Sequence, residues 1–255
     1  MQKKDPAKKL AGNWIIVYPE HRLKNERERD IYARYQDSVV NLYGLKLVSF
    51  KEGGTFQQVD SVFSAPGNWR IEKDTLLRIT KGGKGFHPLT TVIRSLYDTE
   101  LQLIHYLTME RSRIKVIWHL KKIEDDQPEA LLFDPAANNW RKVPTASESI
   151  PLMKARLSAM LHYYGTYFLL VGKEASYFQP AQIPLPFNYY QHAVGLNSFI
   201  KTAFRELFYD VTDANTAYEL LQTVFSTLRG QYETDKNFTT EYGLFLNKMA
   251  EKMKR

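Results

Sequence analysis

The 255-residue sequence contains no cysteine. Disulfide bonds, thiol catalysis and metal sites with cysteine ligands are therefore excluded. No run approaches 18 apolar residues, so a transmembrane helix is not expected. The first residues, Met-Gln-Lys-Lys-Asp-Pro, have the charge of a signal peptide but lack its apolar core. We expect either a cytoplasmic protein or one from which a signal was removed and to which Met1 was added.

The signatures of common catalytic sites are also missing. None of the six histidines has a partner at His-x-x-x-His spacing, and no serine lies in a Gly-x-Ser-x-Gly turn. The glycine-rich segment 81–88 differs from a phosphate-binding loop because a predicted strand, and not a helix, follows it. The acidic run at 124–126 falls on a predicted linker with no framework to hold it. We expect no enzyme, no metal site and no cofactor.

Composition favours a soluble globular chain with two domains. Hydrophobic residues make up 44% and charged residues 25% of the sequence, which does not favour disorder. Residues 1–123 hold 22 basic and 13 acidic side chains, a net of +9, and the remainder holds 13 and 15, a net of −2. Basic and acidic residues alternate around 22–29, which is typical of a solvated surface. Nucleic-acid binding is therefore not favoured.

The first half of the chain has the patterns of short β-strands. β-Branched and aromatic residues, or apolar residues at every second position, recur between glycine-containing turns. Eight strands are expected, near residues 14–18, 39–50, 55–63, 69–72, 76–80, 89–96, 101–107 and 114–121. The polar stretch 19–37 is long for a loop, and a helical turn is expected near 29–35. Eight sequential strands with short connections predict an all-β domain, an up-and-down antiparallel barrel.

The lengths of the connections predict a barrel with unlike ends. Turns at 52–54, 73–74 and 97–99 are tight, whereas most connections at the other end, 19–37, 64–67, 81–88 and 109–112, are longer. An eight-stranded barrel encloses its own side chains or one small ligand. We therefore expect an open mouth at the end with the long connections, with these ligand-binding residues on its rim or upper wall: Phe63, Trp69, Phe86, His87 and Met109.

After residue 123 the pattern changes. Prolines punctuate residues 124–149, which are predicted to form a linker that packs on another part of the chain through its Leu, Phe and Trp residues. Residues 150–255 are predicted to form an all-α domain of about four helices, because their apolar residues recur at i, i+3 and i+4. The helices are expected at 150–176, around 196–207, from 212 and from 239.

Residues 10–123 resemble a lipocalin-like (calycin) domain. The resemblance rests on Gly12-Asn13-Trp14 at the first strand, on eight strands in order, and on a basic residue at the end of the last strand. It implies that Trp14 closes the barrel floor beneath Lys121 or Lys122, where lysine replaces the more usual arginine. The Glu-Gly-Gly-Thr-Phe and Gly-Asn-Trp-Arg-Ile-Glu segments also resemble bacterial envelope domains of this type. If a signal was removed, the resemblance implies the periplasm or cell envelope.

Two functions fit these patterns. The first is a non-enzymatic binding protein whose barrel holds a small apolar or amphipathic ligand at its open end. The alternative is a structural or interaction protein in which side chains fill the barrel and the helical domain docks a protein partner. The apolar circumference of residues 161–171 motivates the alternative, because such a helix is buried on several sides or binds a partner.

Overall fold

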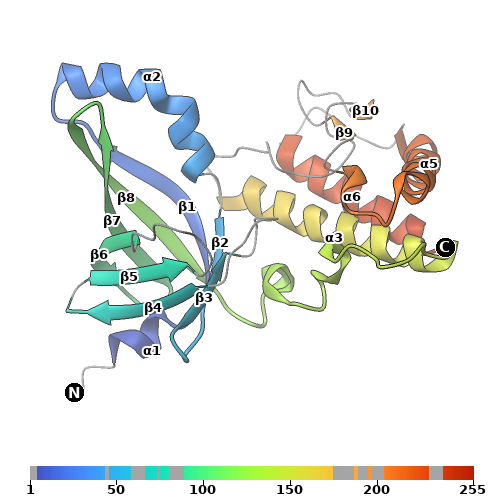
Figure 1. The fold of residues 1–255 in the computed structure, drawn as a ribbon, viewed down its shortest axis with the longest axis horizontal. Helices are drawn as coiled ribbons and strands as arrows, with labels where there is room; N and C mark the ends of the chain where they lie inside the picture. The colour runs from blue at the N-terminus through green and yellow to red at the C-terminus, as the bar shows by residue number, and fades with distance from the viewer. Residues whose placement is uncertain are drawn as a thin grey trace. The chain divides into compact units, whose positions relative to one another are not determined.

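A computed structural model gives the fold of residues 5–43, 46–58, 67–73, 75–80, 89–174, 187–188, 195–196, 204–229 and 238–255. Two compact units are present (Figure 1). The first comprises Met1–Ala130 with Ala175–Ala181, and the second comprises Leu131–Glu174 with Gln182–Arg255. The helical unit therefore includes residues 131–149, which the sequence assigned to the linker. None of the helices among the described residues is long and apolar enough to cross a membrane.

The first unit is built on eight antiparallel strands that close in a ring. Each strand pairs with the next in sequence, and the last pairs with the first. The strands are β1 (Gly12–Arg22), β2 (Lys46–Phe50), β3 (Thr55–Gln58), β4 (Gly67–Glu72), β5 (Thr75–Thr80), β6 (Leu89–Leu96), β7 (Glu100–Met109) and β8 (Ser112–Ile123). The predicted strand number, order and direction are confirmed in this sheet.

Strand β1 is longer than the sequence predicted. It continues through Pro19 to Arg22, although a strand that ends at Pro19 was expected. Pro19 lacks an amide donor and is tolerated where one edge of a strand is unpaired. Strand β1 pairs with β2 only over Gly12–Ile16. Beyond Ile16, its partner among the described strands is β8. Pro19 therefore lies where its missing donor has little cost.

One end of the ring is closed by the short helix α1 (Pro6–Leu10). Its Leu10 is fully buried, and the indole N–H of Trp14 donates to the Leu10 carbonyl at 2.7 Å. Lys9 pairs with Asp98 in the β6–β7 turn at 3.4 Å. The aromatic residues Phe50, Phe56 and Trp69 belong to the same buried core cluster. We call this the Trp14 end of the ring.

Helix α2 (Glu26–Tyr43) lies at the opposite end, which we call the α2 end (Figure 1). Residues 39–43 therefore belong to a helix, and the predicted strand over 39–50 was wrong in its first part. Asn25 and Glu28 start the helix: Asn25 Oδ1 accepts from the Glu28 amide at 2.9 Å, and Glu28 Oε2 accepts from the Lys24 amide at 2.6 Å. Asparagine that accepts from the amide three residues on is a known helix start signal.

The second unit is built on three long helices among its described residues: α3 (Ile150–Glu174), α5 (Val211–Leu228) and α6 (Phe238–Met253). Two 3-10 helices, η1 (Pro128–Phe133) and η2 (Asn139–Arg141), precede α3. Two short strands, β9 (Phe187–Asn188) and β10 (Gly195–Leu196), form a separate pair. About four helices were predicted here. Most of the one expected around 196–207 lies outside the described residues, and its first position, Leu196, is in β10.

Helices α3 and α6 pack closely because glycines face each other. A Cβ on Gly243 would lie 2.8 Å from the Gly165 carbonyl oxygen and 2.9 Å from the Leu169 amide nitrogen. Aromatic rings fill the rest of this core, and Phe168 and Tyr242 meet edge to face at 4.7 Å. Most of the described apolar side chains of α3 are buried. Helix α3 packs against α6, η2 and α5.

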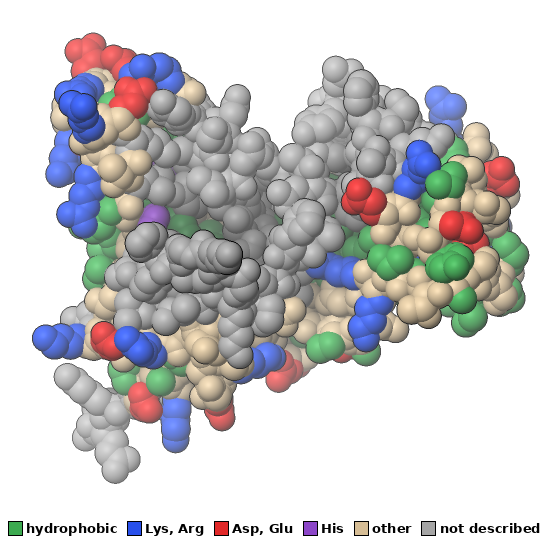
Figure 2. Space-filling view, viewed as in Figure 1, with side chains coloured by type: hydrophobic (Ala, Val, Ile, Leu, Met, Phe, Trp, Pro, Cys, Tyr) green, Lys and Arg blue, Asp and Glu red, His purple; other side chains and the backbone are tan. Residues whose placement is uncertain are grey.

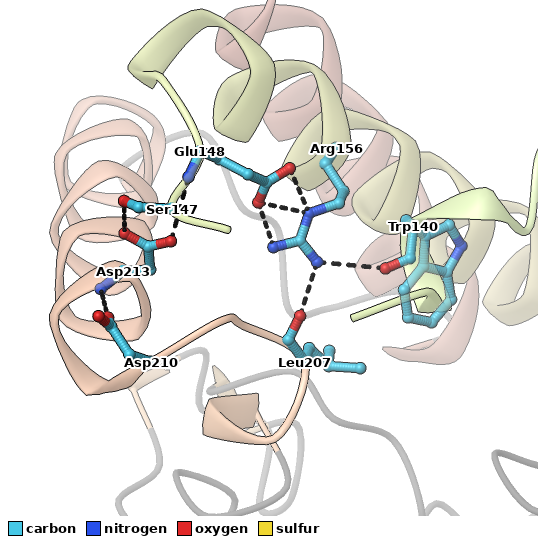
Figure 3. Close-up of polar contacts among 7 residues, drawn as sticks. All are labelled: Trp140, Ser147, Glu148, Arg156, Leu207, Asp210 and Asp213. Atoms are coloured by element: carbon cyan, nitrogen blue, oxygen red, sulfur yellow. Dashed lines mark hydrogen bonds and ion pairs between the residues drawn. The ribbon is translucent and has the colours of Figure 1, made fainter. Parts of the chain in front are cut away.

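A polar network ties the start of α3 to the start of α5 (Figure 3). Arg156 Nε donates to Glu148 Oε2 at 2.8 Å, and its Nη1 donates to the Leu207 carbonyl at 2.9 Å. Asp213 accepts from the Ser147 hydroxyl at 2.7 Å and from the Glu148 amide at 3.2 Å. The Arg156 and Glu148 side chains are only 13% and 14% exposed. The network joins segments distant in sequence, so we assign it a structural role.

Candidate functional site

The candidate site lies on the inner face of the ring at the α2 end. His21 of β1 and His105 of β7 both pair in register with Val116 of β8. Val116 is fully buried in the core of the ring, and residues paired in register share a face of the sheet. The two imidazoles therefore belong to the inner wall and flank Val116 on either side.

A β-bulge directs His21 inward. Ile16 pairs with Leu120 and Tyr18 pairs with His119, so Val17 is an extra residue on β1. An extra residue reverses the alternation of the strand beyond it. Tyr18 is therefore outside the ring and 39% exposed, whereas Pro19 is buried. Simple alternation from Trp14 would have directed His21 outward, which is why the sequence did not single it out.

Each of the two histidines packs against an aromatic ring. The His21 ring lies 4.4 Å from the Tyr32 ring of α2, and the His105 ring lies 5.6 Å from the Trp118 ring of β8. Ile31 of α2 is fully buried within the core cluster of the ring. Helix α2 thus contributes an apolar and an aromatic side chain to the same region as the histidines.

Exposure differs between the two ends of the inner face. Trp14 at one end is fully buried, whereas His21, Tyr32 and His105 at the other end are each partly exposed. The residues at the Trp14 end are therefore the more deeply buried, and the inner-wall histidines at the α2 end keep partial exposure.

The electrostatic setting of this wall favours neutral or anionic groups. Burial lowers the pKa of His21 below its ordinary value of 6.5. The described groups near it include the Tyr32 ring of α2 and Val116 of β8. No Asp or Glu occupies an inner-facing strand position among the residues whose side chains the structure describes. Glu28 of α2 is buried, but its carboxylate accepts from the Lys24 amide.

Helix α2 is joined to the neighbouring hairpin by an ion pair. Arg34 Nη2 lies 3.0 Å from Glu110 Oε2 in the turn between β7 and β8. Glu110 and Arg111 both have positive φ, 44° and 66°, as a two-residue turn between paired Met109 and Ser112 requires. This contact places the helix over the same end of the ring as the histidines.

The structure places only one of the predicted ligand-binding side chains. Phe63, Phe86 and His87 lie outside the described residues, and Met109 ends β7 with a side chain that is not described. Trp69 is buried, meets Phe50 edge to face at 5.7 Å, and donates from its indole nitrogen to the Lys51 carbonyl at 3.1 Å. These contacts place Trp69 beside the β2–β3 turn, toward the Trp14 end, so it does not join the two histidines.

Trp14 and the two lysines lie at the closed end. Lys122 pairs in register with Trp14, and its Nζ lies 5.7 Å from the centroid of the indole ring. Lys121 pairs instead with Ile15 and belongs to the outer face. Of the two lysines, Lys122 is thus the one beside the tryptophan. Its distance from the ring is within the range of cation–π attraction.

A third histidine forms a different cluster on the outer face. His119 stacks on Tyr18 with ring centroids 4.2 Å apart, and its Nε2 lies 3.3 Å from Glu20 Oε2. Glu20 also pairs with Arg22. No group of three or more His, Asp or Glu residues in the described part of the chain could hold a metal ion. We regard the outer cluster as part of the protein surface. Basic and acidic side chains are also mixed on the surface around α2 (Figure 2).

No known protein family has a model that matches this chain, and no curated protein resembles it in sequence. The functional argument therefore rests on the geometry of the ring.

Proposed function

We propose that the first unit is a lipocalin-like binding module that holds a small amphipathic ligand inside the ring at the α2 end. The observation that carries this proposal is the pair His21 and His105 on the inner wall, both partly exposed. Polar groups placed in an otherwise apolar wall orient ligands in proteins. Ile31, Val116 and Trp118 supply the apolar surface beside them.

The closed Trp14 end supports the same proposal. Trp14, Phe50, Phe56 and Trp69 fill that end with buried rings. A ligand would therefore enter from the α2 end, where polar side chains meet the apolar wall. We propose that the protein acts by binding, because the described residues near the histidines do not include a nucleophile, base and oxyanion-hole arrangement.

Trp118 provides a direct test. It lies beside His105, so a ligand at this site should change its fluorescence. A panel of fatty acids and porphyrins is titrated while tryptophan fluorescence and thermal unfolding are followed. Ligand at 100 times its Kd should stabilise the protein by about 2.7 kcal/mol.

Two variants locate the signal. In Trp118→Phe the fluorescence response should be lost. In Trp140→Phe, which alters the helical unit, the fluorescence response and the thermal shift should both remain. If no compound in the panel moves either signal of the wild-type protein, the ring is filled by its own side chains and the proposal fails.

A further inference from the structure

We infer that the ligand is an organic acid whose carboxylate lies between His21 and His105 while its apolar body lies along Val116, Trp118 and Ile31. This inference rests on the proposed function and adds the chemical class of the ligand. It also identifies His21 and His105 as the residues that determine this specificity.

The first argument is the position of the imidazoles. His21 on β1 and His105 on β7 lie on either side of Val116, which belongs to the strand β8 between them. Neighbouring strands lie about 4.8 Å apart, so the two residues are about 10 Å apart at the backbone. A carboxylate has two oxygens, each of which accepts hydrogen bonds, and can therefore accept one from each imidazole.

The second argument is charge. The inner-facing strand positions with described side chains include the two imidazoles and Lys122 but no carboxylate. A buried ammonium group on a ligand would need an acidic partner, because an unpaired charge is costly to bury. A carboxylate, in contrast, can be met by imidazoles that donate hydrogen bonds or take up a proton. The wall thus favours an acid over an amine.

The third argument is the surroundings of each ring. Tyr32 holds the His21 ring and Trp118 holds the His105 ring through aromatic contacts at 4.4 and 5.6 Å. Rings held by packing lose less conformational freedom when a ligand binds. The two head-group residues are therefore fixed by different elements, α2 on one side and β8 on the other.

The inference is tested by comparing dodecanoic acid with 1-dodecanol, which share a chain and differ in the head group. The acid should bind the wild-type protein at least tenfold more tightly than the alcohol, since hydrogen bonds to charged groups are the stronger kind. His21→Gln and His105→Gln should each remove most of this preference. His119→Gln, an imidazole on the outer face, should keep it.

A second measurement does not depend on the variants folding. In NMR spectra of the wild-type protein, dodecanoic acid should shift the imidazole signals of His21 and His105 and leave those of His119 in place. Equal affinity for acid and alcohol would overturn the carboxylate inference and leave the binding proposal standing. An acid preference that survives in both inner-wall variants would overturn the assigned residues. The binding proposal itself would be overturned if neither compound binds and no fatty acid or porphyrin of the wider panel changes the fluorescence or the thermal unfolding.

Discussion

Gly12 lies against the side chain of Lys122, and a Cβ on Gly12 would be 2.6 Å from Lys122 Cε. The φ of Gly12 is +133°, a conformation that residues with a side chain rarely adopt. Glycine at this position therefore allows the lysine chain to cross over the strand and reach the Trp14 ring.

Gly12→Ala should destabilise the first unit by about 1–3 kcal/mol, because it adds backbone strain and displaces Lys122. Thermal and urea unfolding followed by tryptophan fluorescence would measure the change. Gly53→Ala is the matched control, since a Cβ there meets nothing within 4 Å. Equal stabilities of the two variants would contradict the role given to Gly12.

Gly243→Ala should separate α3 from α6 and cost about 1–3 kcal/mol, because the new Cβ meets backbone atoms that cannot rotate away. The higher helix propensity of alanine offsets up to about 1 kcal/mol of this loss. Leu244→Ala on the same helix serves as control, because Leu244 is 43% exposed. Urea denaturation followed by far-UV circular dichroism compares the two, and a more stable Gly243→Ala variant would refute the close packing.

Glu148→Ala should destabilise the helical unit by about 3 kcal/mol, because it leaves the mostly buried guanidinium of Arg156 without its carboxylate. Glu72→Ala removes a surface pair with Arg70, whose side chains are 57% and 63% exposed, and should cost less than about 1 kcal/mol. Free energies of unfolding from urea titration would separate these cases. A cost below 1 kcal/mol for Glu148→Ala would show that the network does not hold the two helix starts together.

Acid should destabilise the ligand-free protein partly through His21. Its pKa is lowered in the folded state, so the unfolded state takes up a proton more readily. The resulting stability is fully present above pH 6.5, the ordinary value, and is lost as the pH falls through the lower pKa of the folded state. His21→Gln should flatten the pH dependence of the unfolding free energy in this range. A steeper slope in His21→Gln would contradict the assigned direction.

The strands could be predicted from the sequence because their signals are local. Alternating residues such as Ile114, Val116 and Trp118, and the glycine turn at 53–54, directly indicate a strand and a hairpin. Helix α2 was underestimated because residues 39–43 are apolar and β-branched enough to resemble the strand that follows them. In the sequence, Asn25 and Glu28 are the residues that indicate the start of this helix.

The candidate site was harder to predict than the fold. The inward direction of His21 depends on the bulge at Val17, which appears only in the pairing of β1 with β8. The proximity of Tyr32 depends on how α2 returns to the sheet. Both are relations between distant segments, which alternation within one strand does not reveal. The face of His105, by contrast, follows from alternation with Leu103 on the same strand.

The bulge at Val17 lets β1 carry one residue more than its partner strand at this point. Without Val17, Tyr18 would follow Ile16 directly and would still pair with His119, so Pro19 and His21 would keep their inward positions. If Val17 itself paired with His119, in contrast, Tyr18, Glu20 and Arg22 would face the interior in place of Pro19 and His21. The bulge therefore keeps a carboxylate and a guanidinium out of the lining of the ring.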